Sequence, residues 1–147
     1  MASGYKPLEE VHSYVREVLD KNVGAPITIT TIVDIMNMIG KCVVAGNVRR
    51  TAEIVFGDST SDEYINLKNY KKNPHRESYG WTSNNSIFAE LGMDYREAAD
   101  RINDNGEPGF AWLQNMQDYS RMKNGRDRKD HSCLLYTSPS PRDGLLA

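Results

Sequence analysis

The chain has 147 residues, enough for one domain with a core of its own. A formal net charge of −2 and a pI near 5.9 do not indicate the excess of basic residues that is typical of a nucleic-acid-binding protein. The N-terminus lacks the apolar segment of a signal peptide, and the most apolar window, residues 32–44, is too short and too interrupted to span a bilayer. Its two cysteines, Cys42 and Cys133, make no disulfide framework, so we expect a cytoplasmic protein without membrane or nucleic-acid partners.

Two helices are predicted at the start of the chain. Pro7 suits the first turn of a helix, and apolar residues recur at helical spacing up to Leu19, before N-V-G-A-P at residues 22–26 ends the pattern. Thr28 or Thr30 can cap the second helix. The expected buried stripe of that helix consists of Ile32, Ile35, Met36, Ile39 and Val43.

A corner is expected at Ala45-Gly46-Asn47, because glycine and asparagine accept a positive φ. Arg49 and Arg50 follow it, ahead of a predicted buried strand over residues 52–56. Planar guanidinium groups favour phosphate or carboxylate partners, which makes both arginines candidates for an anion site. Structural ion pairs with nearby acids are an equally open alternative.

A polar turn over residues 57–62 leads into a short helix that Asp62 can cap. The segment at residues 69–79, N-Y-K-K-N-P-H-R-E-S-Y, is then a predicted loop, because Pro74 prevents a helix from continuing. It carries the basic side chains of His75 and Arg76, for which simple solvation is the more common explanation.

A second strand is expected over residues 80–89, entered through a polar cluster. The hydroxyl and carboxamide groups of this cluster can hydrogen-bond a sugar or a base. Turn hydrogen bonds to the neighbouring backbone are the more frequent role of such groups. The candidate residues are Ser83, Asn84, Asn85 and Ser86.

Asp94 and Glu97 have the spacing of a capping box, and a third helix is predicted after them. A tight turn at residues 105–109 leads into a short buried strand at 110–113, and a last helix carries Met116. Helices that alternate with short apolar strands predict an α/β fold. About three strands are few for a self-sufficient sheet, which suggests a piece of a larger one.

Several catalytic motifs are missing. Gly40-Lys41 lacks the glycine and the hydroxyl residue that a P-loop requires, and no G-x-G-x-x-G precedes a helix. The three histidines are scattered without metal-ligand spacing. The residues alone therefore indicate an α/β segment with a possible anion site and specify no reaction.

Three blocks in order carry a family resemblance: V-V-A-G-N-V-R-R-T-A-E-I at residues 43–54, W-T-S-N-N-S at 81–86 and N-G-E-P-G at 105–109. Together they resemble the adenosylcobalamin-dependent (class II) ribonucleoside-triphosphate reductases, in particular the monomeric branch. The resemblance extends from about Leu8 to Asp130.

The resemblance implies a segment of a ten-stranded α/β barrel whose active cysteine lies on an internal loop. It implies adenosylcobalamin as cofactor, a ribonucleoside triphosphate as substrate, a deoxynucleotide effector and a thioredoxin-like reductant. The reaction is 2′-deoxyribonucleotide synthesis for DNA replication and repair through a thiyl radical. Cofactors of this kind supply the radical chemistry, and the protein places the reacting groups.

The family's Asn-Pro-Cys-Gly-Glu block, with the radical cysteine and a glutamate, is missing after residue 109, and neither Cys42 nor Cys133 has its context. The resemblance therefore implies a fragment that is inactive alone. It also implies that the loop at residues 71–79 relays effector identity to the substrate base. The candidate substrate- or effector-binding residues are Arg49, Arg50, His75, Arg76, Ser83, Asn84, Asn85 and Ser86, with no catalytic or metal-binding residue among them.

A different origin is expected for the last segment. Residues 133–143, C-L-L-Y-T-S-P-S-P-R-D, resemble the translation of a transposase sequencing adapter, so residues 133–147 are expected to be a non-native tail and residues 1–132 the barrel fragment. A non-catalytic nucleotide-binding module is the alternative function. The gene sequence beyond residue 132 distinguishes the two hypotheses.

Overall fold

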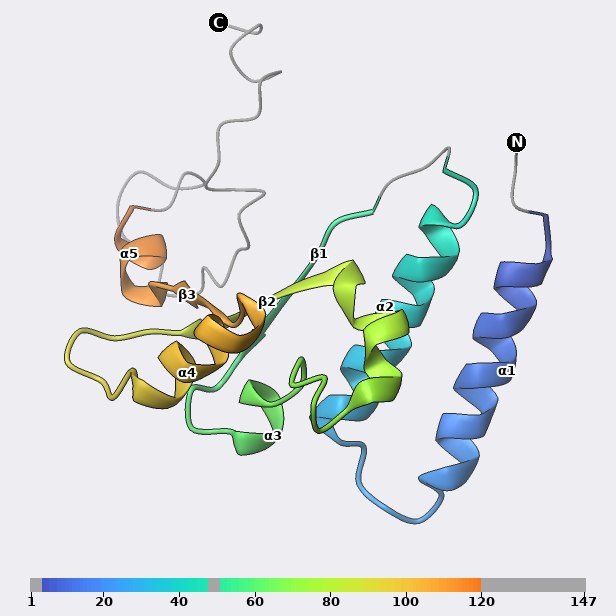
Figure 1. The fold of residues 1–147 in the computed structure, drawn as a ribbon, viewed down its shortest axis with the longest axis horizontal. Helices are drawn as coiled ribbons and strands as arrows, with labels where there is room; N and C mark the ends of the chain where they lie inside the picture. Colours follow the sequence, from blue (N-terminus) through green and yellow to red (C-terminus); the bar gives the residue numbers. More distant parts are fainter. Residues whose placement is uncertain (1–3, 48–50, 120–147) are drawn as a thin grey trace, which may run out of the picture.

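A computed structural model describes residues 4–47 and 51–119 (Figure 1). Eight α-helices and β-strands follow one another, with two short 3-10 helices, η1 (Pro74–Ser78) and η2 (Gly80–Thr82), between α3 and β2. The α-helices and strands are α1 (Lys6–Lys21), α2 (Ile29–Val44), β1 (Glu53–Gly57), α3 (Asp62–Ile65), β2 (Ser83–Phe88), α4 (Arg96–Asn105), β3 (Gly109–Ala111) and α5 (Leu113–Asp118).

The three strands form one parallel sheet in the order β1-β2-β3. Val55 lies opposite Asn85 in the first pair, and Ile87 lies opposite Phe110 in the second. Each pair of strands is connected through helical segments, which is the arrangement that parallel strands require. The α/β prediction is confirmed at this level, and each of the three predicted strands is found within three residues of its expected start.

The first two helices form an antiparallel pair, with α2 between α1 and the sheet (Figure 1). Pro7 lies in the first turn of α1, as predicted. The side chain of Thr28 caps α2, because its Oγ1 accepts a hydrogen bond from the Thr31 amide at 3.1 Å. Val11 of α1 and Met38 of α2 join Tyr79 in a small buried cluster. After α2 the chain turns at Asn47, whose φ of 55° confirms the expected left-handed corner.

The predicted buried face of α2 is wrong. Val33, Asn37 and Met38 are buried, whereas four of the five residues of the expected stripe are exposed and Ile35 is half-buried. Periodicity identified an apolar helix correctly but could not show which of its apolar sides faces the sheet. The exposed four are Ile32, Met36, Ile39 and Val43.

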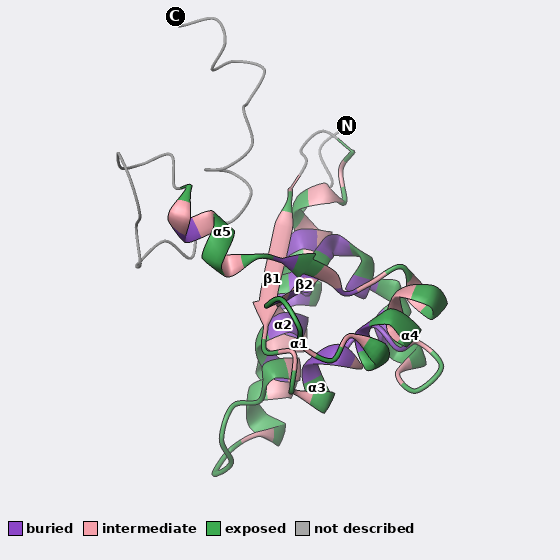
Figure 2. Ribbon diagram, turned by 90° about the vertical axis from the view of Figure 1, so that its left-hand side faces the viewer, coloured by how far each residue is buried: buried purple, intermediate pink, exposed green. Residues whose placement is uncertain are grey.

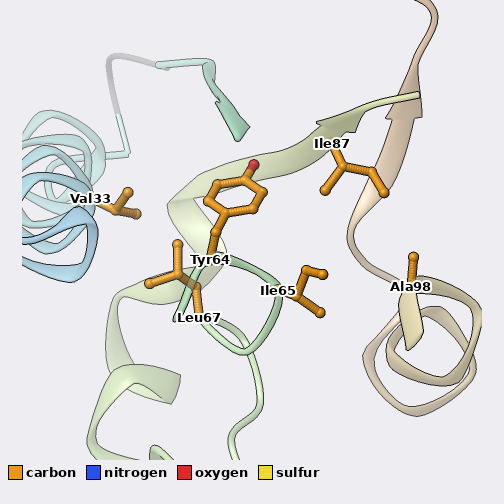
Figure 3. Packing of buried hydrophobic residues seen from close by; sticks show 6 residues of the cluster. All are labelled: Val33, Tyr64, Ile65, Leu67, Ile87 and Ala98. Atoms are coloured by element: carbon orange, nitrogen blue, oxygen red, sulfur yellow. The ribbon is translucent and has the colours of Figure 1, made fainter. Parts of the chain in front are cut away.

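The main core lies between α2, α3, α4 and the sheet (Figure 3). Tyr64 is its central side chain, and it points its hydroxyl at the strands. That hydroxyl lies 2.7 Å from the carbonyl oxygen of Val55 in β1 and 2.8 Å from that of Ser86 in β2. The Tyr64 hydroxyl thus bridges β1 and β2, while the aromatic ring packs in the core. The cluster comprises Val33, Tyr64, Ile65, Leu67, Ile87 and Ala98.

Two predicted helix caps differ from the structure. Ser61, not Asp62, caps α3, because its Oγ accepts from the Tyr64 amide at 3.2 Å. The capping box at α4 is wrong, since Asp94 accepts from the amide of Arg96, two residues later, in a tighter turn. The last helix, α5, ends at Asp118, and none of the described helices is long and apolar enough to cross a bilayer.

Candidate functional site

The polar cluster predicted on the second strand forms the first four residues of β2. Side chains alternate between the two faces of a strand, and burial follows that alternation here. Ser83 and Asn85 are buried toward the helices, while Asn84 is exposed and Ser86 is half-buried on the other face. The four candidates therefore divide into two pairs with different surroundings.

The buried pair belongs to a hydrogen-bonded network. The hydroxyl of Ser83 lies 2.9 Å from Oδ1 of Asn85, and the backbone N–H of Asn85 donates to Oε2 of Glu107 at 2.9 Å. Lys68 completes the network: its ammonium group donates to the Ser83 carbonyl and lies 2.7 Å from the same Glu107 oxygen. Buried polar groups of this kind need such partners, so these side chains hold β2 in place.

The outward pair lies on the sheet face opposite the core. Within residues 4–47 and 51–119, the side chains of Asn84 and Ser86 have no hydrogen-bond partner. A Cβ on Gly109 would lie 3.0 Å from the Ser86 hydroxyl, so the glycine of N-G-E-P-G leaves room for that hydroxyl. Phe56 and Phe88 stack nearby on the same face at 5.3 Å between ring centroids. These polar groups can therefore bind a ligand without breaking the fold.

Arg76 is only 1% exposed, so the solvated-loop interpretation of its segment is wrong for this residue. Its Nε donates to Oδ1 of Asp34 in α2 at 2.7 Å, Nη2 pairs with the same carboxylate, and Nη1 donates to the Leu67 carbonyl. Pro74, expected to keep the segment irregular, instead begins the 3-10 helix η1 that carries Arg76 inward. A planar guanidinium with fixed partners on several sides anchors this segment to α2.

Two tyrosines extend the contact between Asp34 and Arg76. The Tyr79 hydroxyl donates to Oδ2 of Asp34 at 3.3 Å, and its ring lies 5.9 Å from that of Tyr14 in α1. Burial raises the pKa of the Tyr79 phenol, which keeps it protonated as a donor. Tyr79 thus contacts Tyr14 of α1 with its ring and the Asp34 carboxylate of α2 with its hydroxyl.

The other basic candidates lie elsewhere. His75 is exposed on η1, next to the buried Arg76 in sequence. Arg49 and Arg50 lie outside the described residues. The structure therefore brings Ser83 and Asn85 together, separates them from Asn84 and Ser86, and places Arg76 in a structural ion pair.

A second group of polar side chains lies where α2 crosses the start of β1. Asn37 is 1% exposed, yet its side-chain amide oxygen and nitrogen have no hydrogen-bond partner within residues 4–47 and 51–119, and Oε2 of Glu53 has none there either. The Glu53 carboxylate occupies the space that a Cβ on Gly40 would fill. Burial raises the pKa of Glu53. Gly40, which failed as part of a P-loop, is thus required here by close packing.

A shallow hollow lies at the carboxyl ends of β1 and β2. Ligands of parallel α/β sheets commonly bind at this edge. None of the candidate residues that the structure describes lines it, because Ser83 to Ser86 are the first four residues of β2 and lie toward its amino end. The lining residues are Phe56, Gly57, Asp58, Ser59, Phe88, Glu90 and Met93.

Sequence reasoning missed Asp34, Lys68 and Glu107, which hold the candidate residues in place. One signal was present for Asp34, a lone acid inside an otherwise apolar helix, since such residues are usually paired. Lys68 and Glu107 have polar neighbours in the sequence, so their sequence context gives no comparable signal. No group of three or more potential metal-ligating side chains lies together in the part of the chain that the structure describes.

Comparison with curated proteins gives clear relatives. A probable adenosylcobalamin-dependent ribonucleoside-triphosphate reductase of Dictyostelium discoideum is 63% identical over 93% of this chain and 19% of its own length. The corresponding reductase of Euglena gracilis is 54% identical over 90% of this chain, and that of Lactobacillus leichmannii 39% over 84%. The resemblance drawn from the three sequence blocks is therefore confirmed.

The chain spans about a fifth of the length of the curated relatives it matches. No family model matches it. No solved structure matches it either.

Proposed function

We propose that this chain is a section of the catalytic barrel of an adenosylcobalamin-dependent ribonucleoside-triphosphate reductase. The complete protein would convert ribonucleoside triphosphates to 2′-deoxyribonucleotides for DNA replication and repair, with a deoxynucleotide effector and a thioredoxin-like reductant as partners. The 63% identity to the Dictyostelium discoideum protein across nearly the whole chain carries this proposal. Residues 1–132 would be the barrel section, and residues 133–147 a non-native tail.

The sheet supports the larger barrel. All-parallel sheets are normally covered on both faces, and in the part of the chain that the structure describes the helices α2, α3 and α4 pack against one of them. β1 is half-buried along its whole length (Figure 2). In a ten-stranded barrel the strands before β1 and after β3 would pair with the two edges, and the open face would line the interior.

On this proposal the eight candidate residues have different roles. Asn84 and Ser86, on the open face, would contact the nucleotide, as would His75 on the exposed turn before β2. Arg49 and Arg50 would contact its phosphates. Arg76, Ser83 and Asn85 would instead position these groups through their buried partners, Asp34 and the pair formed by Lys68 and Glu107.

Adenosylcobalamin, when bound, supplies the radical that starts the chemistry in this class of enzyme. The described histidines, His12 and His75, lie exposed on separate elements, and nothing in the described residues marks a binding site for this cofactor. We therefore place the cofactor's contacts elsewhere in the complete protein and assign no chemical step to the residues of this chain.

Expression of the full-length protein tests the proposal. It should form deoxyribonucleotides from ribonucleoside triphosphates when adenosylcobalamin and a dithiol are supplied. The 147-residue chain alone should form none, because neither of its cysteines stands in the context of the radical cysteine. Product formation is measured by chromatography. A full-length protein that binds nucleotide without reducing it would instead favour the non-catalytic module.

Substitution of two neighbouring asparagines distinguishes an effect on nucleotide binding from an effect on stability. In the full-length protein, Asn84→Ala should raise KM for the nucleotide with little change in stability, since its side chain is exposed and unpaired within the described residues. Asn85→Ala should instead cost about 1–3 kcal/mol of unfolding free energy, because it leaves the buried Ser83 hydroxyl without its partner. Steady-state kinetics and urea unfolding measure the two effects. Equal effects of both variants on KM would contradict this division.

A further inference from the structure

Three buried polar atoms lie unpaired where α2 crosses the first residue of β1. They are the side-chain amide oxygen and nitrogen of Asn37 and Oε2 of Glu53, and none has a hydrogen-bond partner within residues 4–47 and 51–119. Asn37 is so deeply buried that bulk water does not reach its carboxamide. Buried polar groups are nearly always paired, so three unpaired atoms in one place require a common explanation.

The backbone brings the two side chains to the same place. Asn37 and Gly40 lie three residues apart on α2, and residues at this spacing share one face of a helix. The Glu53 carboxylate fills the space that a side chain of Gly40 would occupy. Cβ positions at this spacing are about 5–6 Å apart, so the carboxylate lies within reach of the Asn37 carboxamide after a side-chain rotation.

The two groups complement each other in one protonation state. A carboxamide offers an acceptor oxygen and an NH2 donor, and a protonated carboxyl group offers an O–H donor and an acceptor oxygen. Side by side they exchange two hydrogen bonds, which gives each of the three unpaired atoms a partner. An ionised carboxylate only accepts, so it can pair with Nδ2 of Asn37 but leaves Oδ1 without a donor.

The elements beside Glu53 on the sheet side supply no counter-charge. Thr82 of η2 donates its hydroxyl hydrogen bond to the backbone carbonyls of Asn37 and Tyr79, at 3.1 and 2.9 Å. Ser83, which lies opposite Glu53 in β2, bonds Asn85 through its hydroxyl. Neither η2 nor β2 contains a charged residue, so an ionised Glu53 finds no cation on these two elements.

Helix α2 supplies none either within the described residues. Asp34 is paired with Arg76, Lys41 forms no ion pair in this part of the chain, and Cys42 packs toward α1. Burial accordingly raises the pKa of Glu53 above its ordinary value of 4.5. The titratable side chains of α2 are Asp34, Lys41 and Cys42.

We propose that protonated Glu53 and Asn37 form a reciprocal pair of hydrogen bonds that fastens β1 to α2 and weakens as the pH rises. The carboxyl O–H donates to Oδ1 of Asn37, and Nδ2 donates to the other carboxyl oxygen. Loss of the proton removes one of these bonds and leaves a charge in a buried place. The pair depends only on residues of this chain and not on the reaction of the complete protein.

The raised pKa fixes the direction of the pH dependence. The stability that Glu53 contributes is fully present below pH 4.5 and is lost as the pH rises through the raised value. Glu53→Gln provides the reference, because glutamine has nearly the same shape, does not titrate and can exchange the same two hydrogen bonds with Asn37.

Hydrogen exchange detected by mass spectrometry measures this contact locally in the full-length protein. Peptides from β1 and the second half of α2 are compared between the unsubstituted protein and Glu53→Gln at the same pH, so the intrinsic pH dependence of exchange cancels. Between about pH 5 and about pH 8 the unsubstituted protein should lose protection relative to the variant, by about tenfold for each unit by which the pKa is raised. Glu10→Gln, at an exposed position of α1, should change exchange of β1 at neither pH.

Exchanging the two groups tests whether they contact each other. Asn37→Asp alone places a second carboxylate against Glu53, so at about pH 8 the exchange of β1 should be faster by about tenfold or more. Adding Glu53→Gln restores one acid and one carboxamide in exchanged places. The double variant should therefore exchange within about twofold of the unsubstituted protein. If Asn37→Asp alone does not fold, recovery of folding in the double variant is the same result.

Four outcomes would overturn the proposal. A ratio of exchange rates that stays constant with pH would show that the contact does not depend on the proton. Slower exchange in the unsubstituted protein than in Glu53→Gln at the higher pH would show that the ionised carboxylate is the bound form, held by a water molecule or a cation. A double variant no better than Asn37→Asp would show that the two groups do not meet. Failure of Glu53→Gln to fold would contradict the pair as well, since glutamine matches the protonated acid.

Discussion

Asp34→Ala should lower the free energy of unfolding of the chain by about 3–5 kcal/mol, because it leaves the Arg76 guanidinium buried without its counter-charge. The same carboxylate also accepts a hydrogen bond from the Tyr79 hydroxyl. Its removal therefore strips partners from two buried groups at once. Arg76→Ala should have an effect of similar size, since it leaves the carboxylate unpaired.

An exposed ion pair provides the matched control. Asp94 and Arg96 also form a close carboxylate–guanidinium contact, but both side chains lie in solvent, so Arg96→Ala, which leaves the backbone hydrogen bond to Asp94 in place, should cause no measurable loss of unfolding free energy. Urea unfolding of each variant gives the free energies. Combined Asp34→Ala and Arg76→Ala should lose much less than the sum of the single changes. Additive losses would show that the two residues act independently and would contradict the proposed anchor.

Gly57→Ala should cost about 2–3 kcal/mol, because a Cβ at this position would lie closer than 3.0 Å to the ring of Tyr64. Overpacking is usually relieved by movement of the neighbouring side chain. Tyr64 cannot move freely, since it is 2% exposed and its hydroxyl is held between the carbonyl oxygens of β1 and β2. The added methyl group must therefore displace a strand or break these hydrogen bonds.

Gly24→Ala controls for the change from glycine to alanine. Gly24 has a φ of +81° and open space around it, so alanine there should cost only the left-handed backbone, about 1 kcal/mol. Thermal unfolding of both variants provides the comparison. If Gly57→Ala were no more harmful than Gly24→Ala, Tyr64 would have to be less firmly held than its contacts indicate.

Local signals predicted most of the elements. Pro7, the threonine cap at Thr28 and the Gly46-Asn47 corner are features of the nearby chain, and each is found where expected. Tertiary contacts decided the rest. The burial of Arg76 depends on Asp34, 42 residues earlier, and no local pattern connects them. The side of α2 that faces the sheet could likewise not be predicted from the sequence, because apolar residues occur on almost every side of that helix.

The candidate site shows the same limit. The strand beginning at Ser83 could be predicted, and strand alternation then divides its four polar residues between two faces. Which face meets the helices depends on Tyr64, Leu67 and Lys68, whose positions follow from packing. The sequence therefore identified the polar residues but not which of them remain available to a ligand.

The order of the strands has a consequence for synthesis on the ribosome. Val55 pairs with Asn85, thirty positions along the chain, and Ile87 with Phe110, twenty-three positions along. Each of these strand pairs can therefore form soon after its second strand is translated. The nascent polypeptide can thus add β2 to β1 and then β3 to β2 in the order of synthesis.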